Sequence, residues 1–240
     1  IVSPHVVEVY EYGEEANGHK FLVMEYLNGE ALDTIIKGEG PVSIQKALTY
    51  IGQIGKALEA AHSAGIIHRD LKPANVMLCQ TPKGEETIKI LDFGIAKIND
   101  NTGSFATRTG AMIGTCNSMA PEQVLGQSID ARTDIYALGI LFYYLLKGKY
   151  PFHGKTISSI LYQHVHARAT PIDDVLGEPV PMALNKLMLK CLEKERSDRF
   201  KNMKKFLKAL SAIGVQDSDA SSLPLLRHPR RETLPKDHPR

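Results

Sequence analysis

Two short predicted strands joined by a tight loop constrain this chain most, because polar residues flank the pair on both sides. The strands are expected near Val76–Gln80 and Thr87–Leu91, around the loop Thr81–Glu86. His68-Arg69-Asp70-Leu71-Lys72-Pro73-Ala74-Asn75 precedes the first strand, and Asp92-Phe93-Gly94 follows the second. A hairpin therefore brings both polar segments to the same end of a small sheet.

The expected register of this hairpin predicts an oxygen-rich site. If Gln80 faces Thr87, the same register places Asn75 opposite Asp92, with Cβ atoms about 5 Å apart. An amide oxygen and a carboxylate are hard ligands suited to Mg²⁺, which takes few protein groups and adds phosphate oxygens.

Two further residues complete a phosphoryl-transfer pattern. Asp70 supplies a free carboxylate just upstream, and Lys72 supplies a cation for a phosphate group. Each piece alone is weak, since an isolated D-F-G is usually a turn and an isolated H-R-D a solvated loop. Their order around one hairpin favours the chemical interpretation.

The rest of the chain places strands first and helices afterwards. Val6–Tyr12 and Lys20–Tyr26 are expected as strands around the turn Glu14–Gly18, and Asn28-Gly29 ends the second. A long stretch from Ile95 to Ala120 is rich in Gly, Thr, Asn and Ser. Helices are predicted from Ser43 to Gly65 and over Arg132–Lys147, Ile157–Ala167, Met182–Glu195 and Asn202–Ile213. This order predicts an α+β domain with a mainly helical second half.

Composition and sequence patterns argue against several classes of protein. A formal net charge of +2 argues against a nucleic-acid footprint, and 43% hydrophobic with 23% charged residues is ordinary for a globular protein. The longest apolar run, Ile135–Leu146, is shorter than the ~20 residues of a membrane span, so a buried helix is expected. His164 and His166 point to different sides of a helix and are expected at the surface. Three scattered cysteines favour neither disulfides nor a zinc site: Cys79, Cys116 and Cys191.

These motifs together resemble the eukaryotic-like (Hanks-type) serine/threonine protein kinases of bacteria. His68–Asn75 resembles the catalytic loop, and Asp92-Phe93-Gly94 the D-F-G motif. Ala120-Pro121-Glu122 resembles the A-P-E motif, and Arg199 stands where the family pairs an arginine with that glutamate. Asp134 to Gly139 is similar to D-x-W-x-x-G, with Tyr136 in place of Trp.

The resemblance implies a bilobal protein-kinase-like fold of the α+β class. Residues 1–27 would be a β-rich remnant of the N-lobe with the hinge, 28–214 the mainly helical C-lobe, and 215–240 a disordered Pro/Arg-rich tail. The family's G-x-G-x-x-G loop and V-A-I-K lysine are absent from the 240 residues. We therefore expect an N-terminally truncated catalytic domain that by itself binds ATP weakly and transfers phosphate poorly.

The resemblance also implies individual roles, with ATP and Mg²⁺ as cofactors. Asp70 would orient the substrate hydroxyl, Lys72 would steady the phosphate, and Asn75 with Asp92 would hold Mg²⁺. Thr115 would hydrogen-bond Asp70 and Lys72. The implied nucleotide contacts are Met24 as gatekeeper, the backbone of Glu25 and Leu27, and Met77 and Leu91 beside the adenine, although a methionine such as Met77 is more often core filler. The implied structural residues are His68, Arg69, Phe93, Glu122, Asp134 and Arg199.

Control and location follow from the same resemblance. Thr107 and Thr109 resemble paired activation threonines, and a phosphate there would be gripped by Arg69. The implied partners are protein substrates and a second copy for trans-autophosphorylation, with no nucleic acid. A cytoplasmic location is expected, with any membrane anchor outside this chain.

Two other functions fit parts of the pattern. A pseudokinase acting as a binding module would lack Asp70, Asn75 or Asp92, and all three are present. A small-molecule phosphotransferase of kinase-like fold would lack the A-P-E segment, which this chain contains. Cys116 and Ser118 depart from the family's usual residues, so the shape of the pocket for the substrate residue stays open.

Overall fold

The computed structural model describes residues 1–15, 17–81, 83–93 and 115–220, with side chains as far as Ile213. Its α-helices are α1 (Leu32–Glu39), α2 (Ile44–Ser63), α4 (Pro121–Val124), α5 (Ala131–Lys147), α6 (Ile157–His166), α7 (Met182–Cys191) and α8 (Met203–Ala220). Its strands are β1 (Val9–Glu14), β2 (Lys20–Met24), β3 (Gly29–Ala31), β4 (Val76–Gln80), β5 (Glu86–Ile90), β6 (Asp174–Val175) and β7 (Glu178–Pro179), and its 3₁₀ helices are η1 (Pro73–Asn75) and η3 (Arg196–Asp198).

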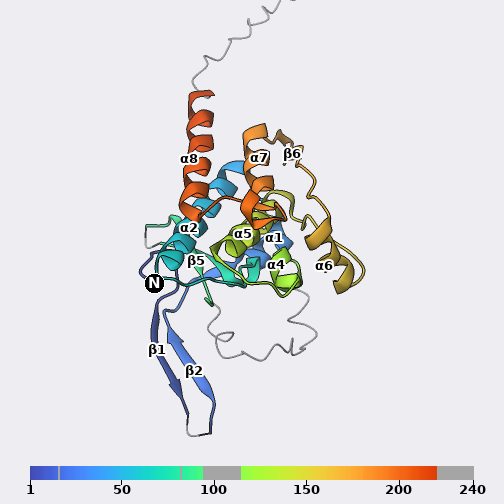
Figure 1. Cartoon of the computed structure of the whole chain (residues 1–240). Helices are drawn as coiled ribbons and strands as arrows, with labels where there is room; N and C mark the ends of the chain where they lie inside the picture. Colours follow the sequence, from blue (N-terminus) through green and yellow to red (C-terminus); the bar gives the residue numbers. More distant parts are fainter. Residues whose placement is uncertain (16, 82, 94–114, 221–240) are drawn as a thin grey trace, which may run out of the picture.

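Helix α5 forms the centre of a helical body, with the hairpin β1–β2 projecting from it (Figure 1). The Asp130 side chain caps the start of α5 by accepting from Arg132 N, and Gly148 ends it in the left-handed conformation at φ 67°. Every residue from Thr133 to Leu146 is buried, so the prediction of a buried helix is confirmed. A side chain at Gly139 would come within 2.6 Å of Cys191 Cβ, so this glycine lets α7 approach α5 closely.

The three-stranded antiparallel sheet β3-β4-β5 supports the polar loop and packs against α2. Its register differs from the prediction by one residue, since Gln80 faces Glu86 and Val76 faces Ile90. The loop closes early because Thr81 N donates to the Glu85 carbonyl at 2.8 Å. Asn75 therefore does not face Asp92: its carbonyl accepts from Leu91 N at 2.9 Å. The two predicted metal ligands remain at the same end of the hairpin.

The first strand begins later than predicted. Val7 N donates to the Ile90 carbonyl at 3.0 Å, and Ile90 N donates to the His5 carbonyl at 2.9 Å. These first residues pair with the edge of β5, so β1 starts only at Val9. The predictions missed α1 and β3, and they placed the end of α7 at Glu195 rather than Cys191.

The C-terminal helix runs further than expected. Helix α8 continues to Ala220, beyond Val215, where the predicted tail began. The remainder of that tail, 221–240, lies outside the described residues. Within the described part of the chain, no helix combines the length and apolar character needed to span a bilayer.

Candidate active site

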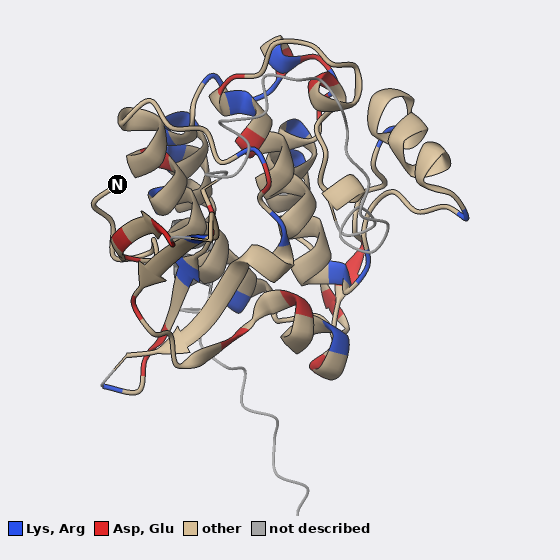
Figure 2. Ribbon diagram, turned by 90° about the horizontal axis from the view of Figure 1, so that it is seen from below, with Lys and Arg blue, Asp and Glu red and all other residues tan. Residues whose placement is uncertain are grey.

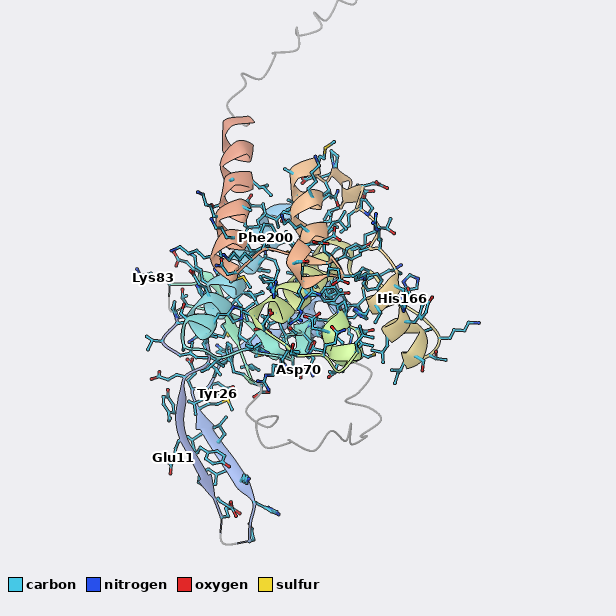
Figure 3. All side chains as sticks on the ribbon, viewed as in Figure 1. Glu11, Tyr26, Asp70, Lys83, His166 and Phe200 are labelled. Atoms are coloured by element: carbon cyan, nitrogen blue, oxygen red, sulfur yellow. The ribbon has the colours of Figure 1, made fainter. Side chains whose placement is uncertain are left out.

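The loop His68–Asn75, which we call the catalytic loop after its predicted role, brings together a carboxylate, an ammonium and the hydroxyl of Thr115. Lys72 Nζ donates to Asp70 Oδ2 at 2.9 Å and to Thr115 Oγ1 at 3.1 Å. Asn75 Nδ2 donates to the Asp70 carbonyl at 3.0 Å, which fixes the loop. Asp70 Oδ1 is buried and has no hydrogen-bond partner among the described residues. Asp70 thus keeps one oxygen free while Lys72 holds the other; Figure 3 shows it on the face of the body from which the hairpin projects.

His68 connects this loop to the residues before Asp92. Its Nδ1 accepts from Asp70 N at 3.3 Å, so its Nε2 carries the proton and donates to the Leu91 carbonyl at 3.1 Å. Burial lowers the pKa of His68 and favours this neutral form. The Phe93 ring lies against it, with centroids 4.7 Å apart.

Asp134, at the start of α5, anchors the backbone of the catalytic loop. Its carboxylate accepts from His68 N at 2.8 Å, from Arg69 N at 2.9 Å and from His62 Nε2 at 2.7 Å. Arg69 has a φ of 68°, which is strained for a residue with a side chain. The buried carboxylate holds this strained turn in place. Sequence reasoning missed His62, which lies 72 residues from Asp134.

Glu122 and Arg199 form a buried bidentate ion pair behind the catalytic loop. Arg199 Nη1 and Nη2 each lie 2.8 Å from one Glu122 oxygen, and Thr133 Oγ1 donates to the same carboxylate at 2.8 Å. Burial opposes ionisation of Glu122, but the hydrogen bonds and charge of Arg199 outweigh it, so the pKa of Glu122 is lowered. The structure forms the pair that the resemblance implied.

Gln123 is a second residue that the sequence did not reveal. Its Nε2 donates to the Arg69 carbonyl at 2.8 Å, and its Oε1 accepts from Ala120 N at 3.0 Å. One amide side chain therefore ties α4 to the catalytic loop. A glutamine after A-P-E carries no distinctive local signal, so this role could be seen only in three dimensions.

Asn75 and Asp92 provide oxygen atoms suited to a cation. Asn75 Nδ2 is bonded to Asp70, which leaves its amide oxygen available, and Asp92 is exposed at φ 45°. Among the described residues, no group of three or more His, Cys, Asp or Glu side chains could hold a metal. An amide oxygen and one carboxylate fit Mg²⁺, which keeps water and phosphate ligands, better than a metal needing a full protein cage.

Comparison with known sequences gives this arrangement a family. Residues 1–209 match the protein kinase domain. The chain belongs to the protein kinase family. It is 38% identical over 213 residues to the probable serine/threonine-protein kinase CA_C1728 of Clostridium acetobutylicum, covering 89% of this chain and 31% of that protein. It is 39% identical over 200 residues to the serine/threonine-protein kinase PknB of Mycobacterium tuberculosis, covering 82% of this chain and 31% of that protein.

The chain spans about a third of the length of the curated relatives it matches. The fold prediction is confirmed: this is an α+β protein kinase domain with a mainly helical second half. The relatives agree with the predicted likeness to bacterial serine/threonine kinases.

Among the residues expected around the adenine site, Glu25 is held by two contacts. Glu25 N donates to the Glu8 carbonyl at 2.9 Å, and the Glu25 carboxylate pairs with Lys89 Nζ at 2.5 Å. The first contact joins the segment after β2 to the residue before β1, and the second joins it to β5. Met24 is exposed, whereas Leu27, Met77 and Leu91 are half-buried. Their nucleotide contacts stay predictions, and Thr107 and Thr109 lie outside the described residues.

A surface histidine was predicted wrongly. His164 on α6 is fully buried, and its Nδ1 lies 2.9 Å from Tyr136 Oη. Burial and the charge of Lys194 lower the pKa of His164 to about 3, so it is neutral. The tyrosine that replaces the family's tryptophan thus has a buried partner 28 residues away. Helical spacing shows which side a residue faces, whereas packing decides what covers that side.

Proposed function

We propose that the protein transfers the γ-phosphoryl group of ATP to serine or threonine hydroxyls of protein substrates. The observation that carries this proposal is the pair Asp70 and Lys72. One buried oxygen of Asp70 lacks a partner among the described residues, while the other is held by the Lys72 ammonium. A hydroxyl that entered here would find an acceptor and a cation side by side.

The proposed step is a displacement at the γ-phosphorus. A bond forms between the substrate hydroxyl oxygen and phosphorus, and the bond from phosphorus to the β–γ bridging oxygen breaks. Asp70 accepts the hydroxyl proton, and Lys72 stabilises the charge on the transferred phosphoryl oxygens. Thr115 orients Lys72 through the 3.1 Å hydrogen bond.

The nucleotide would be oriented mainly by Asn75 and Asp92. Mg²⁺ bound there would neutralise charge on the phosphate oxygens. His68 positions Asp70 and Asp92, because it contacts both Asp70 N and the Leu91 carbonyl next to Asp92. The neutral imidazole bridges two parts of the site without adding a charge.

The clearest test replaces one carboxylate at a time in the longest natural polypeptide that contains this chain. General-base catalysis contributes typically ~10²–10⁴-fold, so Asp70→Asn should lower radiolabelled phosphate transfer by at least about 100-fold, and Asp92→Asn similarly. Asp174→Asn, an exposed change in β6, is the matched control and should leave the rate unchanged. Near-normal turnover in Asp92→Asn would contradict the assignment.

We propose further that the 240-residue chain alone binds ATP weakly. It contains neither a G-x-G-x-x-G loop to cover the phosphates nor a V-A-I-K lysine to pair with them. Isothermal titration with ATP and Mg²⁺ should therefore show no low-micromolar binding. Tight binding without phosphate transfer would instead favour the pseudokinase alternative.

Activation by autophosphorylation is the last part of the proposal. Phosphate on Thr107 or Thr109 would be gripped by Arg69, whose strained backbone adjoins Asp70. Replacing both threonines by alanine should lower activity at least about tenfold, as expected from losing charge-assisted hydrogen bonds. Mass spectrometry of the active enzyme should find at least one of the two phosphorylated. The homodimer and the cytoplasmic location stay predictions.

A further inference from the structure

A cavity of about 330 Å³ lies between α4, α6 and the segment after α7. Helices α4 and α6 lie next to each other (Figure 1). The lining includes Pro121, Leu125, Gln127, Val165, Lys194 and Arg196. The volume falls at the lower end of the range for ligand pockets, ~300–1,000 Å³. None of these six side chains takes part in the proposed phosphoryl transfer, so the cavity requires its own explanation.

One part of the lining is apolar. Pro121 is buried, Val165 is half-buried, and Leu125 is 54% exposed although it is a large apolar side chain. Covering Leu125 would remove apolar surface from water, which is favourable. The cavity therefore offers a contact for an apolar group.

Lys194 places a half-buried cation in the same cavity. Its Nζ donates to the carbonyls of Gln163 at 3.3 Å and His164 at 2.9 Å, and it lies 4.2 Å from the centre of the Phe152 ring. Burial and the charge of Arg199 lower the pKa of Lys194 to about 8, so it remains mostly protonated at neutral pH. Within the described ranges, no carboxylate forms a salt bridge with it. A desolvated cation without an ion-pair partner would gain from an anion.

Arg196 and Gln127 add further donors. Arg196 Nη1 donates to the Ser128 carbonyl at 2.8 Å and forms a salt bridge with Asp130 at 3.1 Å, while its other nitrogens bond to none of the described residues. The Gln127 side chain makes no hydrogen bond within the described part of the chain. Figure 2 shows the charged residues along the ribbon, with lysine and arginine in blue.

The acidic residues of the lining do not cancel these donors. Both Glu122 oxygens are occupied by Arg199. Glu195 is exposed, and within the described residues it forms no salt bridge with Lys194 or Arg196. The cavity therefore combines an apolar contact with the donor groups that remain on Lys194 and Arg196.

We infer that this cavity binds an acidic, apolar segment of a protein partner. A carboxylate of that segment accepts from Lys194 and Arg196, and an adjacent apolar side chain packs against Leu125 and Val165. The inference concerns binding alone and does not depend on phosphoryl transfer.

The experiment uses the 240-residue chain and a fluorescein-labelled peptide of alternating leucine and glutamate. The comparison peptide has the same length but alternates leucine and lysine. Fluorescence anisotropy should show saturable binding of the acidic peptide only, weakened by added salt. Arg196→Gln and Leu125→Asp should each reduce its affinity about tenfold, or ~1.4 kcal/mol.

Two matched variants control for charge and for a new surface aspartate. Lys147→Met removes an exposed cation at the end of α5, and Leu176→Asp changes a 65% exposed leucine between β6 and β7. Both should bind the acidic peptide as the unchanged chain does. Leu125→Asp alters an exposed side chain, so its melting temperature should stay close to that of the unchanged chain.

Three outcomes would overturn the inference. The first is no binding of the acidic peptide up to about 1 mM, the level expected of a very weak interaction. The second is equal binding of the acidic and basic peptides. The third is unchanged affinity in both Arg196→Gln and Leu125→Asp, because the peptide would then occupy another surface.

Discussion

The hairpins β1–β2 and β4–β5 have similar lengths but very different surroundings. In β1–β2 most side chains are exposed, including Tyr10 at 62% and Tyr12 at 57%. In β4–β5, Val76, Ile88 and Ile90 have no exposed surface, because α2 covers that face. The strand pattern therefore predicts that a hairpin forms, whereas the neighbouring helix decides whether it can serve as rigid support.

The two hairpins also differ in their polar connections. β5 is tied to α2 by Gln53 Oε1, which accepts from Ile88 N at 2.7 Å. At Ile90, β5 also forms two backbone hydrogen bonds with the N-terminal residues, since Ile90 N donates to the His5 carbonyl and the Ile90 carbonyl accepts from Val7 N. The base of β1–β2 is joined to β5 through Glu25 and Lys89. The catalytic loop thus adjoins the hairpin that has more support. Mutations in the two hairpins can test this difference.

The largest effect should come from breaking the ion pair inside the body. Arg199→Met leaves Glu122 buried without its cation, and removing one partner of a buried pair costs about 3–5 kcal/mol. Urea unfolding should show this loss in the free energy of unfolding. Arg168→Met, an exposed change after α6, should cost far less. Equal losses in the free energy of unfolding for the two arginine variants would show that the helical body is not the stable part of the molecule.

The next effect compares the hairpins directly. Ile90→Ala removes fully buried methyl groups from β5 and should cost about 2–5 kcal/mol. Val23→Ala removes methyl groups from β2, where the side chain is 42% exposed, and should cost about 0.5 kcal/mol or less. Urea unfolding of both variants gives the difference. A cost for Val23→Ala as large as that for Ile90→Ala would break the comparison.

A smaller effect should come from the link between the hairpins. Burial opposes ionisation of Glu25, but hydrogen bonds from Lys89 and Glu8 N outweigh it and lower the pKa of Glu25. Glu25→Gln should cost about 0.5–1 kcal/mol at neutral pH. Because the folded-state pKa lies below the unfolded one, this difference should disappear as the pH falls below about 4. Glu11→Gln, an exposed change in β1, is the matched control and should leave the free energy of unfolding at neutral pH unchanged.

The smallest effect concerns a charge within the body. The pKa of Lys194 is lowered to about 8, whereas that of an unfolded lysine is about 10.4. Between these values the unfolded chain binds more protons, so this group makes stability rise with pH. Lys194→Met should flatten the pH dependence between about pH 8 and 10, measured by thermal melting. An unchanged slope would show that this ammonium is better hydrated than the structure indicates.

The sequence by itself determined the family, the order of the longer elements and the positions of the kinase motifs. Asp70, Lys72, Asn75 and Asp92 could be selected because they surround one hairpin in a fixed order. Helix α5 could be predicted because an apolar run that is bounded by charged residues and too short to span a membrane is expected to be a buried helix. These features depend on residues close together in the chain, where spacing and local geometry carry most of the information.

Only the tertiary structure decided which distant residues hold these motifs in place. His62 reaches Asp134, Gln123 reaches the Arg69 carbonyl, and His164 reaches Tyr136, each across at least 28 residues. The register of β4–β5 also depended on how its loop closed, which shifted every pair by one residue. Such contacts arise when helices pack and exclude water from polar groups that must then find partners, and sequence spacing does not record which partners meet.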